Sequence, residues 1–317
     1  MTETKQRNLL LEILSKRESA IFIALIAISI FITIFAPRFA TNRNLYLVSR
    51  QISFVAIVAL GELFVILTAG IDLSVGSNVG FSGIMAGLAL AAGIPPLFAL
   101  PLGMLAGIAV GLFNGAVISY VGITPFIVTL GMLSMARGMI WGFTKGNPIT
   151  EIPDTFFFLA EGDFLGVPAS VIIMVILAII VHIVLTYTAF GRRIYAIGGN
   201  EEATALSGIN VKKIKLGVYC ISGLMASISG ILLIARFYSA QPSTGTGWEL
   251  DAIASCVIGG TSLMGGVGSV LGVLIGATIM GVIRNGLVLM KVSVYWQDFI
   301  IGSIIVLAAV IDRVKNK

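Results

Sequence analysis

The segment Gly191-Arg-Arg-Ile-Tyr-Ala-Ile-Gly-Gly-Asn-Glu-Glu-Ala-Thr-Ala-Leu-Ser-Gly-Ile-Asn-Val-Lys-Lys-Ile-Lys215 is a polar stretch between two long apolar runs. It carries five of the 20 Lys and Arg residues of the chain, together with two adjacent acids. A basic segment of this kind divides the apolar sequence into two groups of helices. Because basic loops stay on one side of a membrane, this segment also predicts the orientation of the whole chain.

The composition is typical of an integral membrane protein. The 317 residues are 57% hydrophobic and 11% charged, with a mean hydropathy of +1.04, whereas soluble domains carry about 25% charged residues. The loops are short, so the chain leaves no room for a separate soluble domain. The net charge of +5 is spread over loops and ends, which favours the positive-inside bias over nucleic-acid binding.

Apolar segments recur at the length of about 20 residues that a helix needs to cross a bilayer. They predict an all-α polytopic membrane protein with about ten transmembrane helices. The expected spans are residues 20–36, 45–69, 74–93, 97–120, 124–143, 168–189, 213–237, 249–263, 268–289 and 294–311. Together they form one permease domain, 20–312, between a tail at 1–19 and a tail at 313–317. The polar lead of residues 1–19 is longer than that of a cleavable signal, so we expect the first span to be retained.

The positions of the basic residues predict the orientation. With ten spans, the N-terminal tail, the 190–215 loop and the C-terminal tail lie on one side, and all three are rich in Lys and Arg. The positive-inside rule places this side in the cytoplasm. The 144–167 loop, with four acids and one lysine, is then external. It suits either an interfacial helix or a surface that meets an external partner.

Spans 2–5 and 7–10 are expected to be inverted repeats, an arrangement common in transporters. Span 2 starts outside and span 7 starts inside. Each group also has a Gly-rich polar turn after its first span, at Gly70–Gly76 and at Gln241–Gly247.

Small residues within the spans predict close packing of helices, and polar residues predict a path for a solute. Glycines at every fourth position, such as Gly103 and Gly107, let helix backbones approach closely in lipid. Polar side chains at membrane depth are costly and indicate function. Amides can hydrogen-bond a hydroxylated solute without a charge, so the candidate path residues are Asn78, Asn114 and Asn285. Caps or interfacial positions explain other polar residues: Asp72 and Ser74 at the start of span 3, Glu249 and Asp251 at the start of span 8, and Asp298 near the start of span 10.

Motifs for catalysis or metal binding are absent from the sequence. No Gly-x-x-x-x-Gly-Lys-Ser/Thr loop occurs, so we expect no ATP hydrolysis by this chain. The single histidine, His182, and the cysteines, Cys220 and Cys256, lie in apolar runs without a metal or disulfide pattern. We therefore expect no catalytic residue, metal or cofactor.

A short helix is expected inside the polar segment. Gly198 and Gly199 break the chain, Asn200 is a good N-cap, and the first-turn acids Glu201 and Glu202 suit the helix dipole. Gly208 suits the position after the helix. A solvated connector would explain the basic flanks, but it would not explain the caps or the apolar residues Ala203, Leu206 and Ile209. A helix too short to be stable alone needs a partner.

Several stretches resemble the permease subunit of bacterial ABC importers for monosaccharides, in the ribose-type branch. The resemblance covers the chain from about residue 40 onward, and it is carried by the segments 67–77, 124–131, 198–211, 239–254 and 259–268. It implies a ten-span helical subunit in the bacterial cytoplasmic (inner) membrane, similar in architecture to cobalamin-type importer permeases.

The resemblance also implies partners. A separate cytoplasmic ATPase would dock on Asn200, Glu201, Glu202, Ala203, Leu206, Ser207 and Gly208. A periplasmic or lipid-anchored binding protein would deliver a monosaccharide to the 144–167 and 239–248 loops, and a second permease copy would complete the pair. Ribose leads among the sugars, but the motifs are shared with permeases for xylose, galactose, allose and furanose autoinducers. A proton- or sodium-coupled sugar carrier, with Glu62, Asp251 or Asp298 as coupling carboxylates, and a channel or scaffold stay as alternatives.

Overall fold

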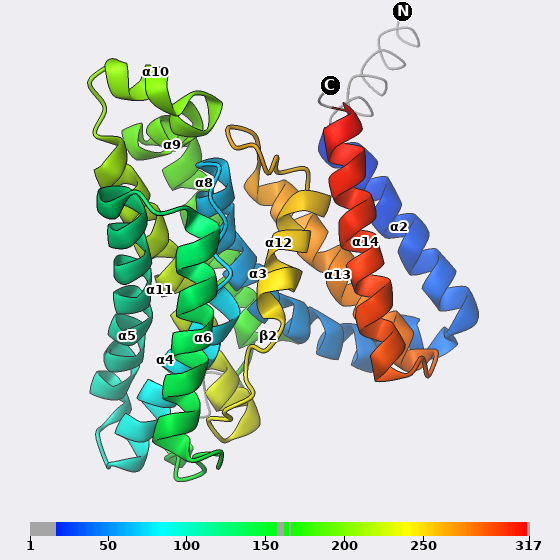
Figure 1. Cartoon of the computed structure of the whole chain (residues 1–317). Coiled ribbons are helices and arrows are strands. Elements are labelled where there is room, and N and C mark those ends of the chain that lie inside the picture. The colour runs from blue at the N-terminus through cyan, green and yellow to red at the C-terminus, as the bar shows by residue number, and fades with distance from the viewer. Residues whose placement is uncertain (1–16, 157–161, 165, 316–317) are drawn as a thin grey trace, which may run out of the picture.

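The computed structural model describes residues 17–156, 162–164 and 166–315. Helices make up nearly all of its regular structure (Figure 1). In chain order they are α2 (Arg17–Phe35), η1 (Pro37–Ala40), α3 (Asn42–Leu67), α4 (Val75–Ala91), α5 (Pro96–Ala116), η2 (Val117–Val121), α6 (Pro125–Thr144), η3 (Asp154–Phe156), α8 (Ala169–Tyr187), α9 (Ala189–Gly199), α10 (Glu201–Leu206), α11 (Val211–Phe237), α12 (Trp248–Ile258), α13 (Val270–Leu289) and α14 (Val294–Lys315). The short strands β1 (Asp163–Phe164) and β2 (Val167–Pro168) pair antiparallel in the 144–167 loop region. Residues 1–16 of the N-terminal tail and 157–161 of that loop lie outside the described residues.

The helices confirm the all-α fold and correct one expected span. Each expected span overlaps a helix, and seven helices of the described chain are long and apolar enough to cross a membrane. The expectation of a full span at 249–263 is wrong, because α12 has only 11 residues, or about 16 Å of helix. Gly260, at a φ of +84°, lies in the glycine-rich turn that follows this helix. The count of ten spans stays a prediction.

Two shorter helices begin where non-helical segments meet. α4 follows the turn 68–74, and α12 follows the segment 238–247. The backbones of Gly76 and Gly245 pack so closely that a Cβ on Gly245 would overlap the carbonyl oxygen of Gly76. The two Gly-rich turns noted in the sequence are therefore in contact. This contact brings the starts of the short helices α4 and α12 together inside the protein.

The contacts between helices match when spans 2–5 (α3–α6) are exchanged with spans 7–10 (α11–α14). α5 packs against α4 and α11, and α13 packs against α12 and α3. In the same way α11 packs on α4, and α3 packs on α12. Such reciprocity is what inverted repeats of spans 2–5 and 7–10 would produce, and it supports that prediction.

Glycines of α5 form its contact with α4 and α11. A Cβ on Gly107 would meet the Ser227 side chain and the Gly223 carbonyl, and one on Gly111 would overlap the carbonyl of Tyr219. Gly103 and Gly115 face α4 and α11 in the same way. The glycine series therefore has the packing role predicted for it.

Substitution of Gly111 by alanine is expected to destabilise the protein by about 1–3 kcal/mol, because the added methyl group meets backbone that cannot rotate away. The matched control is Gly217→Ala in α11, whose Cβ would only touch the edge of the Phe190 ring at 3.4 Å. Thermal unfolding of the detergent-purified protein measures both. A lower Tm for Gly111→Ala alone is expected, and equal Tm values would contradict the packing account.

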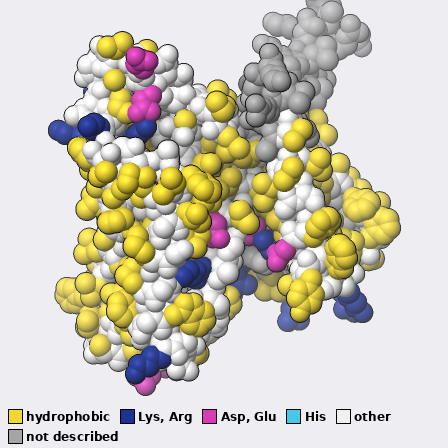
Figure 2. Space-filling view, in the orientation of Figure 1, with side chains coloured by type: hydrophobic (Ala, Val, Ile, Leu, Met, Phe, Trp, Pro, Cys, Tyr) yellow, Lys and Arg dark blue, Asp and Glu magenta, His cyan; other side chains and the backbone are white. Residues whose placement is uncertain are grey.

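The outer surface is apolar. Figure 2 shows hydrophobic side chains spread over much of the visible face. Among the exposed residues are Ile34 of α2, Phe126 of α6 and Val306 of α14. Extended exposed apolar surface marks contact with a membrane or a partner. The described start of α2 and the end of α14 lie at the same end of the molecule as α9 and α10 (Figure 1). Which side of the membrane this end faces stays a prediction.

Candidate functional site

The polar segment contains two helices rather than one. We expected helix only after Gly199, but α9 already runs through residues 189–199. The Thr188 hydroxyl caps it by accepting a hydrogen bond from the Gly191 amide at 3.1 Å. Ile194 and Ile197 are buried against the protein. The signal in the sequence is a capping threonine followed by apolar residues at helical spacing, and the basic pair 192–193 obscured it.

The second helix, α10, has the caps that were predicted. Asn200 Oδ1 accepts a hydrogen bond from the Ala203 amide at 2.8 Å, and Glu201 and Glu202 occupy the first turn. Gly208 adopts a φ of +82°, which favours glycine after a helix. At six residues, α10 is too short to be stable alone.

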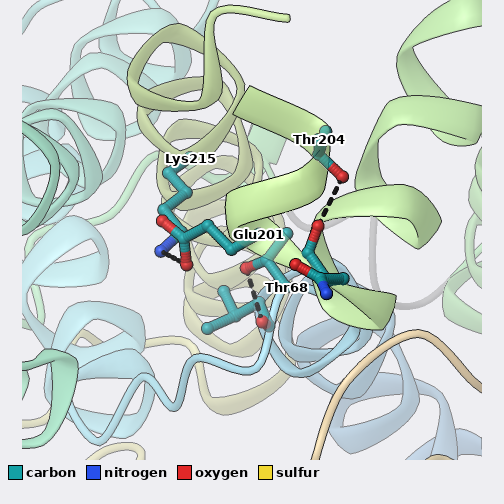
Figure 3. A network of polar contacts seen from close by, with 6 residues as sticks. Thr68, Glu201, Thr204 and Lys215 are labelled. Atoms are coloured by element: carbon teal, nitrogen blue, oxygen red, sulfur yellow. Dashed lines mark hydrogen bonds and ion pairs between the residues drawn. The ribbon is translucent and has the colours of Figure 1, made fainter. Parts of the chain in front are cut away.

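Most of α10 is turned away from the protein. Only Thr204 is buried, and its hydroxyl donates to the Asn200 carbonyl at 2.7 Å (Figure 3). Leu206 is 84% exposed, and Ala203 is also exposed. Ile209, which was expected on the same apolar face, lies beyond the helix and packs half-buried against the core. Ala203 and Leu206 do not pack on the chain itself. They form a surface that a partner can cover.

An ion pair ties α10 to the start of α11. Glu201 Oε2 lies 2.7 Å from Lys215 Nζ, with the side chains 53% and 18% exposed (Figure 3). Exposed pairs of this kind contribute about 0.2–1 kcal/mol. The pair therefore orients α10 more than it stabilises the fold.

At the end of α3, the hydroxyl of Thr68 donates to the Val65 carbonyl (Figure 3).

The end of α9 packs on two turns that lead into the membrane part. A Cβ on Gly198 would overlap the Leu67 carbonyl at the end of α3 and the Gly266 amide. These two groups also bind each other, since Gly266 N donates to Leu67 O at 3.0 Å. We call this contact of Gly198, Leu67 and Gly266 the α9 junction. It connects α9 to the turn before α4 and to the turn after α12.

Tyr195 adds a second link from α9. Its hydroxyl donates to the Gly268 carbonyl at 2.9 Å. Burial raises the pKa of Tyr195 above the ordinary value of a tyrosine, so the hydroxyl stays protonated and remains a donor at neutral pH. The segment 259–268, which carried part of the family resemblance, is thus the surface that receives α9.

The three predicted path residues join neighbouring helices. Asn78 Nδ2 donates to the Gly107 carbonyl at 3.1 Å, and Asn114 Nδ2 donates to Ser74 Oγ at 2.9 Å. Asn285 exchanges hydrogen bonds with Asn44 at 2.9 and 3.2 Å. The structure thus places Asn78 and Asn114 in the α4–α5 packing and Asn285 between α13 and α3. Their role in a path stays a prediction.

Charged side chains in the predicted spans have partners that the sequence did not reveal. Asp251 was expected to cap α12, but its Oδ1 lies 2.7 Å from Arg284 Nη2, and the cap position is Gly247. Arg137 of α6 donates to the carbonyls of Pro242, Thr244 and Gly76.

A buried acid pair supports the start of α4. The carboxylate of Asp72 accepts from the Ser74 amide at 3.0 Å. Ser74 stands at the N-cap position of α4 but makes no side-chain cap hydrogen bond, so the prediction that it caps this helix is wrong. Glu62 Oε1 in turn accepts a hydrogen bond from the Asp72 amide at 3.0 Å.

Within the described residues, no group of three His, Cys, Asp or Glu side chains could hold a metal ion.

Comparison with known proteins gives one family. The sequence profile described as "Branched-chain amino acid transport system / permease component" matches residues 44–309. The ribose import permease protein RbsC of Escherichia coli K12 is 44% identical over 303 residues, which are 94% of each chain. RbsC of Bacillus subtilis is 41% identical over 297 residues, 93% of this chain and 92% of the relative. The D-allose transport system permease protein AlsC of E. coli K12 is 38% identical over 297 residues, 93% of this chain and 91% of the relative. No solved structure matches.

Proposed function

Because this chain belongs to the family of branched-chain amino acid transport system permease components, we propose that it is the membrane subunit of an ATP-driven importer of ribose. The observation that carries this proposal is the 44% identity to a ribose import permease over 94% of both chains. The chain is a multi-pass inner-membrane permease rather than an enzyme, and ATP is hydrolysed on a separate subunit. We propose further that the ten helices α2–α6, α8 and α11–α14 are arranged in the manner of cobalamin-type importers, with α12 crossing only part of the bilayer and both termini in the cytoplasm.

The ATPase docks on α9 and α10. The exposed side chains of α10 offer the ATPase an apolar contact, made chiefly by Leu206, and the acids Glu201 and Glu202 lie beside it. The α9 junction then carries a displacement of this helix pair to the turns next to α4 and α12. Closure of the ATPase on ATP thereby reorients the two shorter helices, α4 and α12, while the long helices around them move little.

The binding protein delivers sugar to the opposite end. The two loops expected to meet it, 144–167 and 239–248, are held together by a β-bridge in which Ile149 and Ala240 exchange hydrogen bonds of 2.9 Å. This bridge makes the two loops one surface. The binding protein supplies most of the selectivity, and the permease supplies the path.

A second copy of the permease completes the path, and α6 is the helix that meets it. Three glycines of α6, at 131, 138 and 142, have open space where a Cβ would lie. Small residues on an uncovered helix face allow close association of helices in lipid.

Cross-linking tests this pairing. Oxidation of membranes that contain Gly138→Cys is expected to convert most of the permease into a disulfide-linked dimer. Ile34→Cys on α2, whose native side chain is 68% exposed, serves as the control and should stay monomeric. Equal yields from the two variants, or none from Gly138→Cys, would reject α6 as the contact between copies.

The identity of the sugar is tested by uptake. The permease is reconstituted in liposomes with its cognate ATPase and binding protein, and labelled ribose is supplied outside with ATP inside. Unlabelled ribose should compete most strongly within a panel that includes allose, xylose, arabinose and galactose. Stronger competition by another sugar would replace ribose as the substrate but keep the importer.

A further inference from the structure

We propose that a sugar-binding subsite lies between α3, α12, α13 and α14, in a cavity of about 390 Å³ lined by Gln51, Trp248, Asp251, Arg284 and Asp298. This inference rests on the proposed function, and it specifies where the translocated sugar is held within the permease. None of these residues is among the three asparagines predicted for the path.

The position of the cavity argues against contact with lipid. Four separate helices contribute its polar side chains, and Figure 2 shows acidic and basic side chains together in the furrow on the visible face. Charged side chains at membrane depth face a protein interior or a water-filled space rather than lipid. The volume falls in the range of about 300–1,000 Å³ that small-molecule sites occupy.

The lining supplies both donors and acceptors. Arg284 directs its Nε and Nη2 groups to Asp251 Oδ1, at 3.3 and 2.7 Å, so the other guanidinium N–H groups are available. The Arg284 side chain is 30% exposed, whereas that of Asp251 is 5% exposed. The ion pair therefore presents its basic partner to the cavity.

The side chains of two further groups in the cavity have no hydrogen-bond partner among the residues that the structure describes. Asp298 is exposed, and its carboxylate accepts no hydrogen bond from any residue that the structure describes. Gln51 is also exposed, and its amide both donates and accepts. A sugar hydroxyl group can donate to Asp298 and accept from Arg284 or Gln51. Both side chains line the same cavity.

The chemistry favours a neutral sugar. Asp251, Arg284 and Asp298 sum to a charge of −1, which repels anions such as sugar phosphates. Trp248 provides an aromatic surface for the C–H face of a sugar ring, and it stands at the first position of α12. A polyol with hydroxyls on its edge and C–H groups on its face matches this combination.

The test uses the complete transporter in liposomes and measures two quantities, ribose uptake and ATPase activity stimulated by the sugar-loaded binding protein. Asp298→Asn and Trp248→Leu are each expected to lower uptake about tenfold, while stimulated ATPase activity stays within twofold of the wild type. The number of ATP molecules hydrolysed per ribose should then rise about tenfold. Trp296→Leu, on the same helix as Asp298 but outside the cavity lining, is the matched control and should behave as the wild type.

The outcomes separate the two proposals. If the wild-type transporter takes up ribose and both cavity variants do so at the same rate, the subsite is overturned and the importer is kept. A parallel fall of uptake and stimulated ATPase activity would also overturn it, because that result indicates a structural role. Failure of the wild-type complex to carry any monosaccharide would overturn the proposed function and the subsite with it.

Discussion

Replacement of Leu206 by arginine is expected to reduce ribose uptake by about 30-fold or more. Leu206 is 84% exposed, so the substitution costs the permease fold little. In the complex, by contrast, the guanidinium would have to be buried in an apolar contact with the ATPase. Loss of a central apolar anchor costs about 2 kcal/mol or more in affinity, which is about 30-fold.

Co-purification of the ATPase with the permease measures this effect directly. Leu206→Met keeps an apolar side chain of similar volume and should retain both the complex and uptake. The Tm of the isolated permease should be the same for both variants. Normal assembly of Leu206→Arg with the ATPase would show that α10 is not the docking element.

Substitution of Gly198 by alanine is expected to lower uptake to below about a tenth of the wild-type rate. The added methyl group would overlap the Leu67 carbonyl and the Gly266 amide, and neither backbone group can rotate away. α9 would then be displaced from the turns next to α4 and α12. ATPase binding should persist, because the surface of α10 is unchanged.

The adjacent glycine provides the control. A Cβ on Gly199 would meet nothing within 4 Å, so Gly199→Ala should transport within twofold of the wild type. The informative measurement pairs uptake with ATPase stimulation by the binding protein, and Gly198→Ala should lose both. Wild-type stimulation in Gly198→Ala would mean that the α9 junction does not transmit the movement.

Local signals in the sequence predicted much of the coupling end. The caps of α10 depend on residues three or four positions apart, so Asn200 and Gly208 could be read from sequence alone. α9 was missed because its basic pair resembles a connector, although Thr188 and the apolar spacing carried the signal. The length of α12 was overestimated because apolar composition continues past the glycines that end it.

Long-range contacts could not be predicted in this way. The α9 junction joins Gly198 to residues on two distant turns, and no local pattern predicts which glycines will meet. Asp251 resembled a helix cap because its partner, Arg284, lies 33 residues away in the chain. Gln51 and Trp248 attracted no notice, since no local pattern shows that the two side chains line one cavity until the helices around it are assembled.

The most direct test of the central claim, that ATP hydrolysis on another polypeptide drives transport through α9 and α10, compares two sets of liposomes. One set contains the permease alone and is tested with imposed proton or sodium gradients. The other contains the permease with its ATPase, supplied with binding protein outside and ATP inside. The account predicts ribose accumulation only in the second set, insensitive to an uncoupler and abolished by Leu206→Arg. Gradient-driven accumulation by the permease alone would contradict it and establish a secondary carrier instead.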